Sequence, residues 1–89
     1  MKKVFKYEVP IKDDVVIEMP EGAEVLLFAA QRGIPCVWAR VDPEAPLVER
    51  RFRFAGTGHP LEANVGNHIG SFLMAQDQLV WHLFEVGGC

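Results

Sequence analysis

Proline and glycine interrupt this chain at short, regular intervals, and this punctuation limits the elements that it can form. Prolines stand at positions 10, 20, 35, 43, 46 and 60, and glycine turn signals follow Pro20 and Gln31. The segments between them are rich in β-branched and aromatic residues, which favour strands. We therefore expect an all-β fold, a single small barrel or sandwich of about six or seven mostly antiparallel strands.

The expected strands fall into hairpins around identifiable turns. Residues 4–9 and 15–19 each end at a proline, and residues 24–31 and 35–41 flank Arg32-Gly33, a pair suited to a tight hairpin. A helix over residues 23–31 is the competing interpretation, because Ala, Leu and Glu favour helix and the apolar run is short. The flanking turns favour the strand, but both interpretations stay open. Residues 68–74 and 78–86 are expected to flank the turn Ala75-Gln76-Asp77 as a closing hairpin.

The stretch RRFRFAGTGHP at 50–60 joins a predicted strand to a predicted turn. Alternation within residues 47–55 gives a core face and a solvent-exposed face. The core face holds Arg50, Phe52 and Phe54, and the exposed face holds Glu49, Arg51 and Arg53. The glycine-rich residues 56–60 are interpreted as the turn that ends the strand, with a phosphate-binding backbone nest as the alternative.

The length, the cysteines and the hydropathy of the chain limit its domain number and its cellular location. A chain of 89 residues predicts one domain with a thin stability margin, with residues 86–89 as a mobile tail, and self-association into a homo-oligomer would stabilise it. Cys36 and Cys89 form no disulfide framework, which indicates a reducing, cytoplasmic location. The longest apolar run, residues 25–30, is far too short to cross a membrane.

The distribution of charge along the chain limits possible partners more than the net charge does. The net charge of −3 argues against binding duplex nucleic acid, which requires neutralised phosphates. All nine lysines and arginines lie at or before Arg53. A surface that binds anions through full cations must therefore be built from the first 53 residues.

Five stretches in one order resemble a family of small uncharacterised proteins of tailed phages and prophage-bearing bacteria. They are EMPEGAEVL at 18–26, IPCVWARVDPEAP at 34–46, GTGHPL at 56–61, IGSF at 69–72 and LVWHLFE at 79–85. The resemblance covers nearly the whole chain and implies a phage origin, but it transfers no activity to particular residues. By gene context it implies a counter-defence role: either sequestration of a host nucleotide immune signal or obstruction of a defence enzyme.

The arginines provide the main candidate site. Arg51 and Arg53, about 7 Å apart on one strand face, would clamp phosphate groups, and Trp38 and Arg40 share a face on the preceding strand. If residues 35–41 pair with residues 47–55, the Trp38 indole lies beside these guanidinium groups, which suits a nucleotide. The alternative is a charged strand surface in which the arginines pair with Glu49 or Glu24 and Trp38 lies in the core.

Metal and enzyme chemistry are not expected. His59, His68, His82 and Cys36 lack the short spacing of a zinc site, so neither a metal nor a cofactor is predicted. His82 is interpreted as half-buried and hydrogen-bonded. Ser71 and Thr57 lie in no nucleophile elbow, and we expect no catalysis.

The sequence thus predicts a cytoplasmic phage protein that binds a small nucleotide signal without cleaving it. The predicted ligand-binding residues are Arg51, Arg53, Arg40 and Trp38, with Gly56, Thr57, Gly58 and His59 as a backbone wall. One alternative is an inhibitor whose acidic, lysine-free C-terminal half covers a basic surface on a host defence enzyme or CRISPR effector. Another is a minor structural or accessory phage protein.

Overall fold

The computed structural model describes residues 1–61, 65–74 and 79–86, and these residues form seven strands and no helix. The strands are β1 (Lys3–Glu8), β2 (Asp14–Pro20), β3 (Glu24–Gln31), β4 (Ile34–Val41), β5 (Leu47–Gly56), β6 (Val65–Met74) and β7 (Leu79–Val86). The all-β prediction is confirmed. The competing helix over residues 23–31 is wrong, because this segment pairs along its length with β4.

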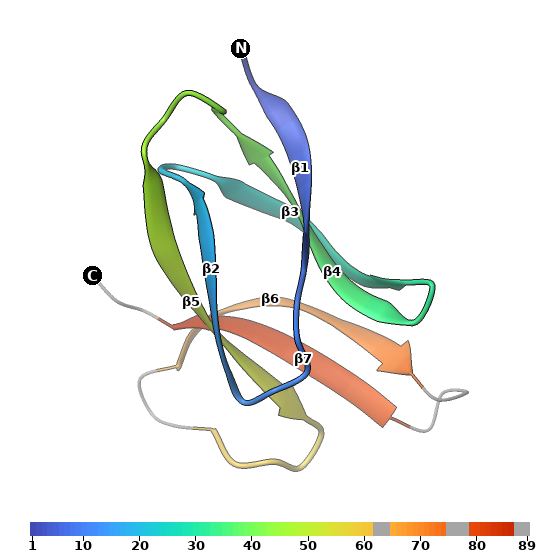
Figure 1. The fold of residues 1–89 in the computed structure, drawn as a ribbon. Coiled ribbons are helices and arrows are strands. Elements are labelled where there is room, and N and C mark those ends of the chain that lie inside the picture. Colours follow the sequence, from blue (N-terminus) through green and yellow to red (C-terminus); the bar gives the residue numbers. More distant parts are fainter. Residues whose placement is uncertain (62–64, 75–78, 87–89) are drawn as a thin grey trace.

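The strands form two antiparallel sheets packed as an open sandwich rather than a closed barrel (Figure 1). The three-stranded sheet has the order β1-β4-β3, and the four-stranded sheet has the order β2-β5-β7-β6. Consecutive strands β4 and β5 therefore lie in different sheets, joined by a loop that contains Pro43 and Pro46. The pairing of residues 35–41 with residues 47–55, on which the arginine site depended, does not form.

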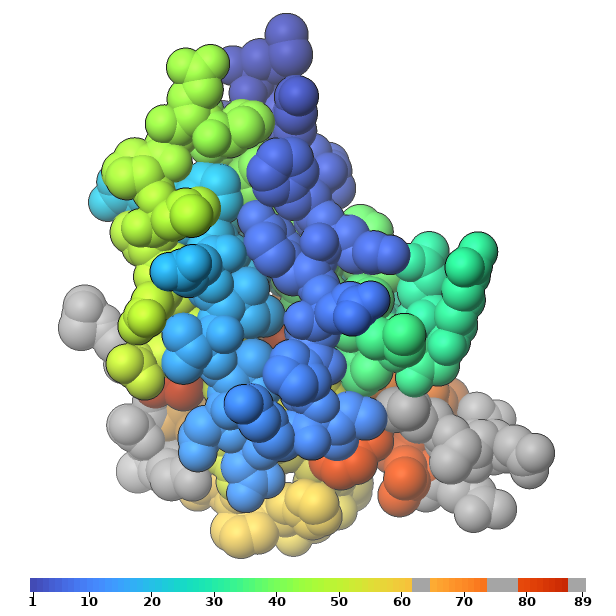
Figure 2. Space-filling view, in the orientation of Figure 1, coloured from blue at the N-terminus to red at the C-terminus, as the bar shows by residue number. Residues whose placement is uncertain are grey.

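The expected hairpin turn between β3 and β4 is confirmed. Arg32 and Gly33 both have positive φ, 53° and 78°, as a two-residue type I′ turn requires. This turn projects on the right of the space-filling view, whereas β1 and β2 cover the front (Figure 2). The expected turn Ala75–Asp77 lies outside the described residues, as do residues 87–89 of the expected tail, and Val86 ends β7.

The core lies between the two sheets, and its buried strand residues come from β2, β3, β4, β5 and β7. The Phe28 ring meets the Phe54 and Phe72 rings edge-on, with centroids 6.0 and 4.8 Å away. The prediction that Arg50, Phe52 and Phe54 share the core face is confirmed. The fully buried side chains include Val15, Met19, Val37, Val41, Phe52, Phe54 and Leu83.

Arg50 enters this core with its charge paired. Its Nη2 donates to Glu85 Oε1 at 2.9 Å, and its Nη1 donates to the Ala23 carbonyl at 2.8 Å. The hydrogen bond with Glu85 raises the pKa of Arg50, while partial burial opposes that rise. Because Ala23 precedes β3, this guanidinium connects the two sheets.

No helix within the described residues is long and apolar enough to cross a membrane.

Gly70 allows β6 to pack closely against β3. A Cβ atom at Gly70 would lie 3.1 Å from the Phe28 Cβ, so Gly70→Ala requires Phe28 to shift by a few tenths of an ångström. We expect the free energy of unfolding to fall by about 1–3 kcal/mol, the cost of overpacking a core. Urea denaturation measures this change. Leu73→Ala, at an exposed position of the same strand, is the control and should cost much less; equal losses would contradict the close-packing account.

Candidate functional site

The structure does not bring the predicted arginine site together. Trp38 and Arg40 alternate with the buried Val37, Ala39 and Val41 along β4, so they face outward from the three-stranded sheet. Arg40 Nε donates to Glu24 Oε1 at 3.1 Å. The alternative ion pairing is therefore the one observed on this strand, and Trp38 is partly buried.

Arg51 lies on the opposite side of the sandwich. It is exposed on the outer face of the four-stranded sheet, with its Nη2 3.8 Å from Glu49 Oε1. Both side chains remain largely solvated, so this pair contributes little to stability. Trp38 and Arg40 face outward from the other sheet, and a shared site with Arg51 is not formed.

The prediction that Arg53 is exposed beside Arg51 is wrong. Its side chain is only 8% exposed, because the start of β2 and the segment after β5 cover it. Its guanidinium donates to the carbonyls of Phe54 at 3.0 Å, Pro60 at 3.1 Å and Asp13 at 3.3 Å. The Asp13 carboxylate, also 3.3 Å away, is largely solvated. Arg53 therefore serves to hold backbone segments together.

The chain that Arg53 holds at Pro60 begins with a tight turn, as predicted. The His59 amide donates to the Gly56 carbonyl at 3.0 Å, and Gly58 has a φ of 88°, as the third position of a type II turn requires. The Thr57 amide donates to the Val80 carbonyl at 3.1 Å, and the Gly56 amide donates to His59 Nδ1 at 3.2 Å. Because these amides bond within the chain, they do not form an anion-binding nest.

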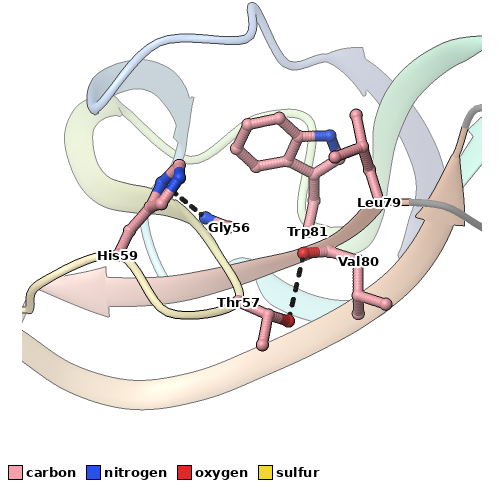
Figure 3. A pocket seen from close by; sticks show the side chains of 6 residues that line it. All are labelled: Gly56, Thr57, His59, Leu79, Val80 and Trp81. Carbon is pink, nitrogen blue, oxygen red and sulfur yellow. Dashed lines mark hydrogen bonds between the residues drawn. The ribbon is translucent and has the colours of Figure 1, made fainter.

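A pocket lies between this turn and the start of β7 (Figure 3). It has a volume of about 110 Å³ and is lined by Gly56, Thr57, His59, Leu79, Val80 and Trp81. The predicted backbone wall at residues 56–59 thus contributes three of its members to a pocket, although the predicted arginines do not line it. Sequence reasoning missed Leu79, Val80 and Trp81, which reach the turn only through the pairing of β5 with β7.

Two aromatic rings define the apolar part of the pocket. The His59 imidazole and the Trp81 indole meet at 76°, with centroids 5.9 Å apart. Phe54 supports the indole from the core at 5.0 Å. A Cβ atom at Gly56 would lie 2.9 Å from the His59 ring, so glycine is needed for this ring position. The pocket therefore presents a supported indole and a more exposed imidazole.

A chain of polar side chains runs from the turn across β7 to β6. Thr57 Oγ1 lies 2.8 Å from His82 Nε2, and Ser71 Oγ lies 2.6 Å from His82 Nδ1 and 2.9 Å from His68 Nε2. The prediction of a half-buried, hydrogen-bonded His82 is confirmed. The grouping itself was missed, and the Ser71–His82 register of the closing hairpin is the signal that would have found it.

The arrangement is suited to holding one planar ring. Pocket walls of imidazole, indole and aliphatic side chains favour stacking and apolar contact, and no lysine or arginine lines them. The volume is well below the roughly 300–1,000 Å³ of pockets that enclose drug-sized ligands. Among the described residues no group of three or more His, Cys, Asp or Glu side chains could hold a metal ion.

Comparison with known proteins assigns a family but no chemistry. The chain belongs to the family described as "Domain of unknown function (DUF7352)", which it matches over residues 1–88. No curated protein and no solved structure matches it. The resemblance to an uncharacterised family is confirmed at this level, and the family description names no source organism, ligand or reaction.

Arg53→Met tests whether Arg53 is a structural residue. The substitution removes the guanidinium that donates to the Asp13, Phe54 and Pro60 carbonyls, so we expect the free energy of unfolding to fall by roughly 2–4 kcal/mol. Arg51→Met, two positions away and exposed, should change it by less than about 0.5 kcal/mol. Urea denaturation of both variants measures the difference, and equal effects would contradict the assignment.

Proposed function

We propose that this member of a family of unknown function is a non-catalytic binding protein for a small nucleotide, whose base occupies the pocket between residues 56–59 and β7. The observation that carries this proposal is that the His59 and Trp81 rings, in edge-on contact, both line a space of about 110 Å³. A space of that size accepts one ring and leaves the sugar and phosphates outside.

Stacking supplies the binding energy in this proposal. Every nucleobase has a π face, and an aromatic side chain stacked on a base contributes about 1–3 kcal/mol. Trp81 is held by Phe54 and the β5–β7 pairing, so little freedom is lost when a base binds it. The exposed His59 ring meets the indole edge-on at the rim of the pocket (Figure 3). The supported indole and the exposed imidazole together favour a flat ligand.

The phosphates have a smaller role here than the sequence predicted. Arg40 is paired with Glu24, Arg53 is covered, and neither lines the pocket. The ligand is therefore distinguished by its base, and a nucleoside and its nucleotide should bind with comparable affinity. The Thr57 hydroxyl lies in the pocket wall and provides a polar contact for the edge of a base.

The biological role in this proposal is sequestration of a nucleotide immune signal in the host cytoplasm by a self-associating phage protein. Its support is the resemblance to phage proteins together with a binding pocket. The alternative of an acidic surface that covers a host enzyme has less support. Of Glu62, Asp77 and Glu85, the described residues include only Glu85, and that carboxylate is paired with Arg50.

Isothermal titration calorimetry with cyclic dinucleotides, cyclic trinucleotides, ADP-ribose and the matching nucleosides tests the proposal. At least one nucleotide and its nucleoside should bind. His59→Ala should weaken binding about fivefold or more, which corresponds to about 1 kcal/mol of lost stacking. Gly56→Ala should act in the same direction, because its methyl group displaces the His59 ring.

Arg40→Ala and Arg51→Ala are the matched controls and should bind as the unmodified protein does. Loss of binding in these variants, with His59→Ala unaffected, would restore the arginine surface as the site. An absence of heat for the whole panel at micromolar concentrations would reject nucleotide binding. A salt-sensitive, stoichiometric host protein partner found in its place would favour the inhibitor alternative.

A further inference from the structure

Two imidazole rings converge on a single hydroxyl group on the outer face of the four-stranded sheet. His82 Nδ1 and His68 Nε2 lie 2.6 and 2.9 Å from Ser71 Oγ, and the two ring centroids are 6.4 Å apart. His82 stands opposite Ser71 in the β6–β7 register, and His68 stands opposite Phe84, two positions further along β7. The backbone pairing of two strands therefore fixes both rings near one point.

The three contacts form one continuous chain whose direction depends on the tautomers of the two histidines. In the tautomer that carries its proton on Nε2, His82 donates to Thr57 Oγ1, and the Val80 carbonyl lies 3.5 Å from that hydroxyl as an acceptor. His82 Nδ1 then carries a lone pair, to which the Ser71 hydroxyl donates. Ser71 in turn accepts from His68 Nε2. A neutral imidazole whose lone pair points at its neighbours is the usual form of a metal-ligating histidine.

We propose that His68 and His82, together with the Ser71 hydroxyl, form a surface site for a divalent transition metal ion of the zinc or copper type. Imidazole nitrogen suits these ions, at distances of about 2.0–2.1 Å. The two nitrogens already lie within 2.9 Å of one oxygen atom, so a small outward turn of the Ser71 hydroxyl makes room for an ion between the rings, and the ion takes the place of the hydroxyl proton at His82 Nδ1.

The protons balance without an additional reactant. In the metal-bound form, His82 carries its proton on Nε2 and donates it to Thr57, which is the outer contact that orients a metal-bound histidine. His68 binds through Nε2 after its ring proton moves to Nδ1. Ser71 keeps its hydroxyl proton and turns it to water. With two imidazoles and a hydroxyl as protein ligands, water completes the coordination, so the site is open and exchangeable.

The site is independent of the proposed nucleotide pocket. His68, Ser71 and His82 do not line the pocket, and Thr57 alone takes part in both groups. The sequence argued against a metal at these histidines, because His68 and His82 are far apart in the chain and form no short ligand motif. Loss of zinc binding would leave the nucleotide proposal intact, and the reverse also holds.

Nuclear magnetic resonance of the imidazole nitrogens during a zinc titration tests the site in the otherwise unmodified protein. Cys89→Ser serves as the background, because a thiol at the chain terminus is itself a zinc ligand. The signals of His82 Nδ1 and His68 Nε2 should shift together and saturate, while those of His59 should stay in place. Unchanged His68 and His82 signals up to millimolar zinc would overturn the proposal.

Calorimetry of variants in the same background gives the second readout. His68→Gln and His82→Gln keep a polar group beside Ser71 and should each lower the zinc affinity at least about tenfold. His59→Gln is the matched control and should leave it unchanged. Equal zinc affinity in all three variants would overturn the proposal, and circular dichroism confirms that each variant is folded.

Discussion

The covered guanidinium of Arg53 fixes the turn on which the pocket depends. It donates to carbonyl groups from three places in the chain: Asp13 just before β2, Phe54 near the end of β5 and Pro60 beyond the turn. A buried charge without such partners is costly, so the chain around it is held in one arrangement. The turn at residues 56–59 is thereby held against β7, where His59 meets Trp81.

The arginines on the two faces of the four-stranded sheet have different partners. On the inner face, Arg50 bonds to Glu85 and to the Ala23 carbonyl and so joins the two sheets. On the outer face, Arg53 is covered by backbone while Arg51 remains in solvent. Three neighbouring arginines thus have three different environments. Arg51 and Arg53 therefore do not present together the anion clamp that their spacing predicted.

Local signals predicted the elements of the fold correctly. The turn at Arg32-Gly33, the strands around it and the core face that carries Phe52 and Phe54 all follow from residue types and alternation. The choice between barrel and sandwich did not follow. Alternation also failed at Arg53, because it describes which side of a sheet a residue faces and not whether another segment covers that side.

The candidate sites depended on contacts between distant segments. The pocket requires the register that sets Gly56 opposite Trp81, and the histidine site requires the register that sets Ser71 opposite His82. Neither register is visible in the sequence before the partner strands are known. The change of sheet at the loop with Pro43 and Pro46 had the largest consequence, because it separated Trp38 from the arginines of β5.

The central claim is that Trp81, rather than Trp38, receives the base. The chain has only these two tryptophans, so a two-dimensional proton–nitrogen spectrum contains two indole N–H signals that report on the two sides of the sandwich. During titration with the nucleotide that binds most tightly, the account predicts a saturating shift of the Trp81 indole signal with the Trp38 signal unchanged. A shift of the Trp38 signal alone would contradict it.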